Sequence, residues 1–307
     1  MKKERLIWFK GEIMPVDEAK VNVLSPTCQF GANVFEGLRC YWNETDQELY
    51  AFRLKEHTER LLDSVKMMRF DLKYSYKELV SSFNDIVKAN NYKEDIALRQ
   101  TIFLDGLGSW FATGPTEMFI APIPKARLFI DENKGIDCCV SSWERINDNS
   151  LSPKIKVGAN YINSRAGQLE ALRNGYDFTI FLNNQGTVSE GPGSCIFIVR
   201  DGVLITPPVT ASILESITRA TIIEIARAEL GLNVLERDVD RTELYICDEI
   251  FLCGTAVEIV PVFSVDRMMV GSGEKGSITK NLQELYFNVV RGNVEKYKHW
   301  LTPIYKI

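Results

Sequence analysis

The order of the apolar runs constrains the fold most strongly. Short β-like runs and helical stretches follow one another irregularly, unlike the strict strand–helix repeat of a parallel α/β sheet. In the first part of the chain, helical spacing of apolar residues marks 54–69 and 76–91, and the strand-like runs are LIWF, VNVL, LYAFR, DIALRQTIFL and EMFIAPI. This irregular order predicts an α+β fold.

An aperiodic, charged segment at 124–135, PKARLFIDENKG, separates the two halves of the chain. We interpret it as an interdomain linker between a small α+β domain at 1–123 and a larger domain at 136–307. The patterns in the larger domain predict helices at 160–174, 217–230 and 277–291, and strands at IDCCVSSW, DFTIFLN, TVSEG, SCIFIVRDGVLITPP, 233–239, 248–253 and TAVEIVPV.

The charge of the chain limits its partners. The 307 residues carry a formal net charge of -5 with acids and bases interleaved, so no basic surface is offered to the phosphates of nucleic acid. The opening MKKERLIWFKGEI has an apolar run too short for a signal peptide, and no stretch reaches the length of a membrane span. We expect a soluble cytoplasmic protein that binds neither nucleic acid nor membranes.

Cysteine and histidine usage narrows the chemistry further. The 7 cysteines are odd in number and form no CxxC pair, which favours buried thiols over a disulfide framework or a zinc site. Only His57 and His299 are available to a Ser-His-Asp hydrolase or a histidine-ligated metal, and neither has a recognisable setting. We therefore expect no metal, and we interpret His57, in the helical pattern LKEHTERLL, as structural.

Two short motifs could present backbone N–H groups to an anion. ESITRATII places Ser216, Ile217 and Thr218 at a helix start, where Ser216 can cap the first turn and the unpaired N–H groups favour negative charge. CGTAVE places Thr255 directly after a strand. Such positions occur in every α/β protein, so each motif alone is weak. Together with Arg60 and a lysine they could hold a phosphorylated cofactor.

The segment SPKIKVGANYIN contains Lys154 and Lys156, followed by small residues. A solvated lysine needs no small neighbours, because its flexible stem carries the ammonium into water, whereas a lysine that approaches a bound molecule does need them. Glu190, beside glycines in VSEGPGS, is either a turn residue or the partner of a protonated ring nitrogen, and Tyr161 could donate to a ring oxygen. A protonated pyridine is an electron sink for a carbanion, so these are the parts of a pyridoxal phosphate site.

Seven ordered motifs resemble those of a known family. VFEGLRCY, FRLKEHTERLLDS, KVGANYINS, SEGPGSCIF, DGVLITPP, ESITRATII and CGTAVEIVPV are similar to the motifs of the class IV aminotransferases, most closely the branched-chain amino acid aminotransferases. The resemblance implies fold type IV: a small α+β domain, a linker and a larger domain of pseudo-barrel character. It also implies a homodimer whose sites lie near the interface.

The resemblance assigns roles to individual residues. Lys156 matches the lysine that binds pyridoxal 5'-phosphate covalently, which leaves Lys154 as a surface residue. Tyr161 matches the partner of the cofactor's 3-oxygen, and Glu190 the partner of its ring nitrogen. The residues that match the phosphate clamp are Arg60, Ser216, Ile217, Thr218 and Thr255, and those that match substrate-binding positions are Phe35, Arg99, Thr255 and Ala256.

The sequence departs from the family pattern around the substrate. Phe30 and Ala97 replace tyrosines that are common in the family, and PIPKARLF lacks its tryptophan and tyrosine but carries Lys125 and Arg127. These departures put specificity for leucine, isoleucine and valine in question. The retained Arg99 could pair with the distal carboxylate of glutamate.

The sequence predicts a pyridoxal phosphate-dependent transaminase. It would exchange an amino group between a branched-chain amino acid or a related donor and 2-oxoglutarate by a ping-pong mechanism, with Lys156 as the catalytic residue. Two alternatives remain at this point: a lyase resembling aminodeoxychorismate lyase, which uses the same lysine for elimination, and a non-catalytic dimer that has kept the fold.

Overall fold

The computed structural model describes residues 5–124 and 134–306, which form two compact units. The first unit comprises residues 5–124, Ile155–Ala159 and 288–306, and the second comprises residues 134–154 and Asn160–Phe287. The domain boundaries taken from the sequence stay a prediction. The compact units differ from them because the segment around Val157 pairs with Val34 and the C-terminal strand joins the sheet of the first unit.

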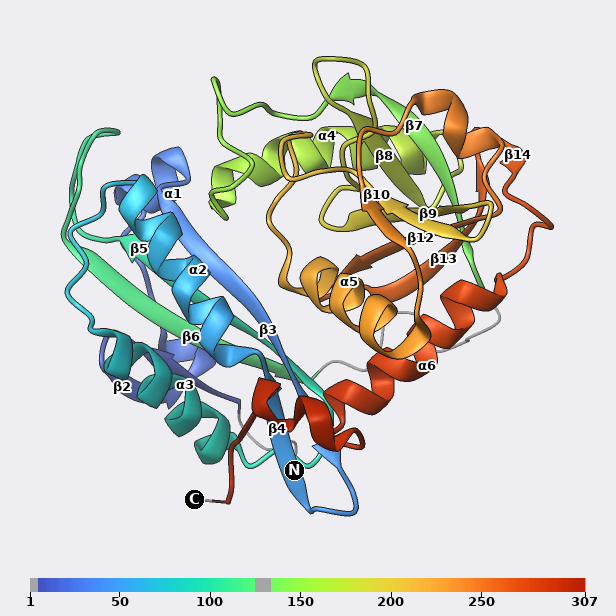
Figure 1. The fold of residues 1–307 in the computed structure, drawn as a ribbon. Coiled ribbons are helices and arrows are strands. Elements are labelled where there is room, and N and C mark those ends of the chain that lie inside the picture. The colour runs from blue at the N-terminus through green and yellow to red at the C-terminus, as the bar shows by residue number, and fades with distance from the viewer. Residues whose placement is uncertain (1–4, 125–133, 307) are drawn as a thin grey trace. The chain divides into compact units, whose positions relative to one another are not determined.

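An antiparallel sheet forms the centre of the first unit, with described strands in the order β15-β4-β3-β5-β6-β1-β2. Helices α2 and α3 pack on it and bury Leu61, Val65, Leu79 and Phe83 against the strands (Figure 1). The strands are β1 (Leu6–Phe9), β2 (Glu12–Pro15), β3 (Asn33–Asn43), β4 (Glu48–Phe52), β5 (Ile96–Leu104), β6 (Thr116–Pro124) and β15 (Leu301–Pro303). The helices are α1 (Pro26–Phe30), α2 (Leu54–Met67) and α3 (Tyr76–Asn90).

Local sequence explains where α3 begins and ends. Ser75 accepts a hydrogen bond from the backbone N–H of Glu78, and the Glu78 carboxylate accepts one from the backbone N–H of Ser75, which is a complete capping box. Asn91 ends the helix in the left-handed conformation. The apolar residues recur every three to four positions and bury one face, as the helical pattern predicted.

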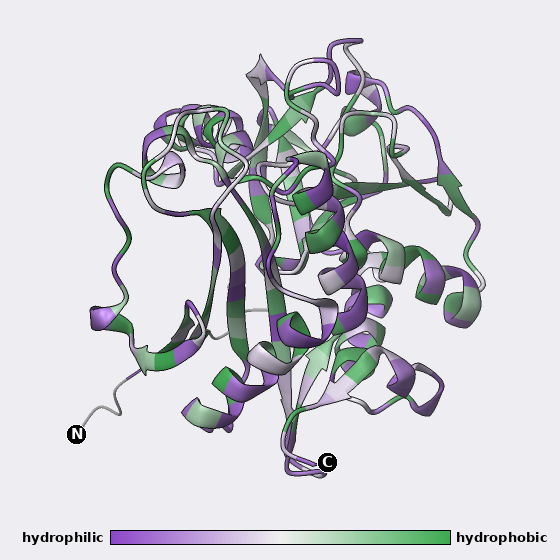
Figure 2. Cartoon of the chain, turned by 90° about the vertical axis from the view of Figure 1, so that its left-hand side faces the viewer, coloured by the Kyte–Doolittle hydropathy of each residue, from purple (hydrophilic) through white to green (hydrophobic). Residues whose placement is uncertain are grey.

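A mixed sheet forms the centre of the second unit, with described strands in the order β11-β10-β9-β12-β13-β7-β8, and β14 beside β13. Figure 2 shows hydrophobic residues along the strands and both kinds of residue on the helices. The strands are β7 (Ile136–Glu144), β8 (Phe178–Leu182), β9 (Cys195–Arg200), β10 (Val203–Thr206), β11 (Val234–Glu236), β12 (Glu249–Gly254), β13 (Glu258–Val265) and β14 (Met268–Met269). The helices are α4 (Tyr161–Arg173), α5 (Ile217–Leu230) and α6 (Ser277–Val290).

The predicted α+β fold is confirmed, and each predicted helix lies within one or two residues of an observed one. Short 3₁₀ helices add to these: η1 (Val16–Glu18), η2 (Gly158–Asn160), η3 (Arg241–Tyr245) and η4 (Glu295–Trp300). Two strand predictions are wrong. VNVL at 21–24 is an exposed turn, because Asn22 accepts a hydrogen bond from the backbone N–H of Leu24 and directs the chain into α1. TVSEG at 187–191 forms only isolated bridges, at Thr187 and Val188.

A buried carboxylate fixes the C-terminal segment. Glu48 on β4 is fully buried and accepts hydrogen bonds from the backbone N–H groups of Ile304, Tyr305 and Lys306 at 3.0, 2.8 and 2.7 Å. We expect Glu48→Ala to lower the free energy of unfolding by about 3 kcal/mol or more, because it leaves one buried and two partly buried donors without an acceptor. Urea unfolding measures this loss. Glu44→Ala, at an exposed position of the same hairpin, is the control and should change stability by less than about 0.5 kcal/mol.

Candidate active site

Lys156 lies on a short segment whose backbone is fixed on both sides. Its carbonyl accepts a hydrogen bond from the Phe35 N–H at 2.9 Å, and its own N–H donates to Oγ of Ser64 at 3.2 Å. Its Nζ lies 5.3 Å from the centre of the Phe35 ring. Lys154, in contrast, is 41% exposed and its Nζ lies 3.7 Å from Oε1 of Glu215. The two lysines therefore have different partners, and their assigned roles stay a prediction.

The small residues behind Lys156 have a structural explanation that differs from the one inferred from the sequence. A Cβ added at Gly158 would lie 2.7 Å from Oδ1 of Asn33, and one added at Gly31 would lie 3.4 Å from Cβ of Ala159. The small side chains thus let residues 155–159 approach the start of β3 closely. They position the backbone of Lys156, whether or not a molecule is bound.

Phe35 lies beside a second cation. Cζ of Arg99 on β5 is 4.0 Å from the centre of the Phe35 ring. Arg99 is directly opposite Gly37 in the β3–β5 register, and Phe35 is opposite Thr101, so the two side chains are diagonal neighbours. The resemblance assigned Phe35 and Arg99 to substrate binding. Arg99 and Lys156 both lie beside the Phe35 ring, so these three residues are close together.

Arg60 on α2 is held by Glu36, a partner that sequence reasoning missed. Nε and Nη2 of Arg60 lie 2.7 and 2.8 Å from the two carboxylate oxygens of Glu36, which is fully buried. Burial alone would raise the pKa of Glu36, but the charge of Arg60 and the hydrogen bonds from Arg60 and His57 outweigh it and hold the pKa well below its usual range. Glu36 is thus ionised and fixes the plane of the guanidinium.

Glu190 in the second unit is also paired with an arginine. Nε of Arg145 donates to Oε1 of Glu190 at 2.8 Å, and both side chains are buried. The backbone N–H of Leu214 donates to Oε2 of Glu190 at 3.2 Å. Glu190 is therefore more than a turn residue: it is a buried carboxylate with two directional partners.

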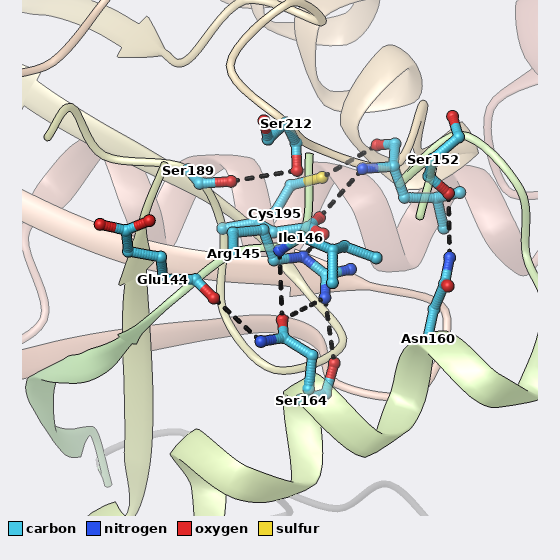
Figure 3. Close-up of polar contacts among 12 residues, drawn as sticks. Glu144, Arg145, Ile146, Ser152, Asn160, Ser164, Ser189, Cys195 and Ser212 are labelled. Atoms are coloured by element: carbon cyan, nitrogen blue, oxygen red, sulfur yellow. Dashed lines mark hydrogen bonds and ion pairs between the residues drawn. The ribbon is translucent and has the colours of Figure 1, made fainter. Parts of the chain in front are cut away.

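Arg145 is itself fixed by the start of α4, as Figure 3 shows. Its Nη1 donates to Oδ1 of Asn163 at 3.0 Å and lies 3.5 Å from Oγ of Ser164. Sequence reasoning missed Arg145. The only signal was its position directly after the strand IDCCVSSWE, and exposed arginines at strand ends give the same pattern.

Tyr161 and Thr255 lie near the loop that carries Glu190. A Cβ added at Gly193 would lie 3.9 Å from Cε1 of Tyr161, and one added at Gly254 would lie 3.3 Å from the Gly193 carbonyl oxygen. Gly193 thus adjoins the Tyr161 ring on one side and, on the other, the end of β12 that precedes Thr255. Oγ of Ser194, the next residue, is buried and has no hydrogen-bond partner among the described residues.

The start of α5 has the predicted cap. Oγ of Ser216 accepts a hydrogen bond from the backbone N–H of Arg219 at 3.2 Å. Ile217 and Thr218 follow in the first turn and are 9% and 2% exposed. The first-turn N–H groups of a helix of this length, together with its dipole, suit an anion.

Residues 5–124 and 134–306 contain neither a cluster of metal ligands nor a membrane-spanning helix. No group of three or more His, Cys, Asp or Glu side chains in these ranges could hold a metal ion. The helices there are too short or too polar to cross a bilayer.

The chain belongs to the class IV aminotransferases, whose family model, described as "Amino-transferase class IV", matches residues 33–265. Among its relatives, the "Probable branched-chain-amino-acid aminotransferase" of Aquifex aeolicus is 42% identical over 97% of this chain and 96% of its own length. The branched-chain-amino-acid aminotransferase of Escherichia coli K12 is 40% identical over 99% of this chain and 98% of its own length.

Solved structures agree with the sequence relatives. The branched-chain amino acid aminotransferase of Thermobaculum terrenum, in its PLP form, matches with a TM-score of 0.93 at 42% identity and covers 100% of both chains. The resemblance read from the seven motifs is confirmed, and so are the fold type and the enzyme class. This chain is an aminotransferase.

Proposed function

We propose that the chain is a pyridoxal 5'-phosphate-dependent transaminase that exchanges an amino group between a branched-chain amino acid, or a related donor, and 2-oxoglutarate by a ping-pong mechanism. The observation that carries this proposal is the match over the whole chain to a branched-chain amino acid aminotransferase in its PLP form. The buried hydroxyl of Ser194, in the loop next to Tyr161 and Gly254, has no hydrogen-bond partner among the described residues, which also fits a site that receives a bound group.

Lys156 is the catalytic residue in this proposal. Its Nζ would hold the cofactor covalently until an amino donor takes its place, and would then serve as the general base that takes the proton from Cα. The cofactor supplies an electron sink for the negative charge that develops at Cα. Because the backbone of Lys156 is fixed by Phe35 and Ser64, only its side chain has to move during these steps.

Tyr161 and Glu190 hold the two ends of the ring. The phenol of Tyr161 would donate to the 3-oxygen, and the carboxylate of Glu190 would keep the ring nitrogen protonated by a charge-assisted hydrogen bond. Arg145 and the Leu214 N–H fix the direction of the Glu190 carboxylate. Arg145 therefore has a positioning role in this proposal.

The phosphate group is bound by Arg60 and by the start of α5. The backbone N–H groups of the first turn and the helix dipole favour the dianion, and Arg60 adds a guanidinium whose plane Glu36 has already fixed. The phosphate-binding residues that we propose are Arg60, Ser216, Ile217, Thr218 and Thr255.

The substrate contacts Phe35, Arg99, Thr255 and Ala256 in this proposal. Lys125 and Arg127, which the sequence suggested as further cations near the substrate, lie outside the described residues. We propose that glutamate or 2-oxoglutarate is one partner and that branched-chain donors react less selectively than in typical family members. Ala97, in place of the family's tyrosine, lies on the same face of β5 as Arg99.

Arg99→Ala should raise KM for glutamate far more than KM for leucine. The lost charge pair with the distal carboxylate of glutamate costs roughly 1–3 kcal/mol of binding if it is shielded from water. Steady-state kinetics with both donors measure the difference, and Lys77→Ala, which removes an exposed cation of the same unit, serves as the control. Equal increases for glutamate and leucine would show that Arg99 does not recognise the distal carboxylate.

A panel of amino acids tests the reaction class. Each amino acid is added to the purified holoprotein, and the conversion of the cofactor to its amine form is followed by absorbance. A transaminase converts the cofactor stoichiometrically and regenerates it when 2-oxoglutarate is added. Elimination products without an amine form would favour the lyase alternative, and the absence of any conversion would favour a non-catalytic dimer.

We propose that the enzyme is a homodimer and works in the cytoplasm. The family resemblance supports the dimer. The cytoplasmic location is supported by the cysteines: all seven are free, six of them buried, which suits a reducing compartment.

A further inference from the structure

His57 and Glu36 form a buried pair directly behind Arg60. Glu36 is fully buried and His57 is 2% exposed, and Nδ1 of His57 lies 2.6 Å from Oε2 of Glu36. The same carboxylate receives the bidentate contact of Arg60, whose side chain is 14% exposed. One carboxylate therefore joins a more accessible arginine to an inaccessible histidine.

We propose that Glu36 and His57 are positioning residues that hold the Arg60 guanidinium in the orientation in which it binds the cofactor's phosphate group. This inference rests on the proposed role of Arg60 as a phosphate ligand. Neither Glu36 nor His57 touches the phosphate in this arrangement. They act through Arg60, in the way that second partners orient the ligands of a metal.

The bidentate contact explains the role of Glu36. A free arginine side chain samples many rotamers and loses this freedom when it binds an anion, which lowers its affinity. With Nε and Nη2 both bound to Glu36, the plane of the guanidinium is fixed before the anion arrives. A carboxylate is needed for this, because an amide in the same place offers only one acceptor atom.

The protonation state of His57 explains its role. Burial lowers the pKa of His57, and the positive charges of Arg60 and Lys156 lower it further, against the opposing effect of Glu36. His57 is therefore neutral at pH 7, and since a carboxylate only accepts, its Nδ1 carries the hydrogen. It binds Glu36 without adding a positive charge that would compete with Arg60 for the carboxylate.

Three residues on one face of α2 take part in these contacts. His57, Arg60 and Ser64 follow one another at intervals of three and four residues and so share one face of the helix. Ser64 accepts the hydrogen bond from the backbone N–H of Lys156. The same helix face thus positions the proposed phosphate ligand and the backbone of the proposed catalytic lysine.

The test compares two ligands that differ only in the phosphate group. Dissociation constants of pyridoxamine 5'-phosphate and pyridoxamine are measured by calorimetry on full-length protein from which the cofactor has been removed. The ratio of the dissociation constant of pyridoxamine to that of pyridoxamine 5'-phosphate reports the contribution of the phosphate group, independently of turnover. The variants are His57→Leu, Glu36→Gln and Arg60→Met, and His57→Asn, whose side-chain amide can replace the Nδ1 donor, tests rescue.

Glu48→Gln is the matched control. It also changes a fully buried carboxylate in the same sheet, but the contacts of Glu48 are to the C-terminal segment and not to Arg60. It should lower stability and leave the ratio of the dissociation constants unchanged. If the other variants affected only stability, they would likewise lower stability and leave the ratio of the dissociation constants unchanged.

We expect His57→Leu and Glu36→Gln to lower the ratio about tenfold, through weaker binding of the phosphorylated ligand alone, and His57→Asn to restore most of it. The inference is overturned if Arg60→Met lowers the ratio but His57→Leu and Glu36→Gln do not, or if Glu48→Gln lowers it as much. A ratio near one in the unmodified protein would instead refute the proposed cofactor binding, and this inference with it.

Discussion

Replacing Lys156 with alanine should reduce turnover by about 10⁴-fold or more, because the variant loses both the covalent attachment of the cofactor and the general base. The fold should remain intact. The hydrogen bonds of Lys156 with Phe35 and Ser64 are made by its backbone, so they survive the loss of the side chain. Steady-state kinetics measure the first effect, and urea unfolding measures the second.

Lys154→Ala is the control for this experiment. The Lys154 side chain is 41% exposed and its contact with Glu215 is a surface ion pair at 3.7 Å, which contributes little to stability. Turnover by Lys154→Ala should stay close to that of the unmodified protein. A large loss in Lys154→Ala with normal turnover in Lys156→Ala would reverse the assignment of the two lysines.

Glu190→Gln should lower kcat by about 10²-fold with the cofactor still bound. A neutral amide supports the positive charge of the ring nitrogen poorly, and removing one preorganised electrostatic partner from an active site typically costs this much. The variant is assayed at saturating cofactor. Glu144→Gln, the same change at the exposed last residue of β7, should leave kcat unchanged. Turnover by Glu190→Gln equal to that of the unmodified protein would contradict the proposed role.

The same substitution should also destabilise the protein, for a separate reason. Arg145 is buried and pairs with Glu190, so Glu190→Gln leaves an uncompensated charge at a cost of about 3–5 kcal/mol. Combining it with Arg145→Gln removes both charges and should recover much of this stability. Turnover should not recover in the double variant, because the carboxylate is still missing. Recovery of both would show that Glu190 acts only as a structural partner of Arg145.

Local patterns in the sequence predicted the helices well, because caps and apolar spacing act within a few residues. Ser216 accepts the cap hydrogen bond that its position indicated, and Ser75 accepts one that sequence reasoning did not single out. The strand expected at VNVL failed for an equally local reason, since the side chain of Asn22 accepts a hydrogen bond from the backbone N–H of Leu24 and turns the chain away. An alternating apolar pattern does not reveal such a turn.

The partners of the candidate site residues could not be predicted from spacing. Glu190 and Arg145 are 45 positions apart, and Glu36 and Arg60 are 24 apart, so tertiary packing brings each pair together. The small residues after Lys156 have a packing explanation that the sequence did not suggest. They let the chain pack against Asn33, which positions the lysine backbone before any cofactor binds.

The most direct test of the account is to find the lysine that carries the cofactor. The holoprotein is reduced with borohydride, digested with trypsin and analysed by mass spectrometry. The account predicts that the pyridoxyl phosphate label lies on Lys156, in a peptide that begins at Ile155 and remains uncut after the modified residue. A label on Lys154, or an unlabelled protein, would contradict the account.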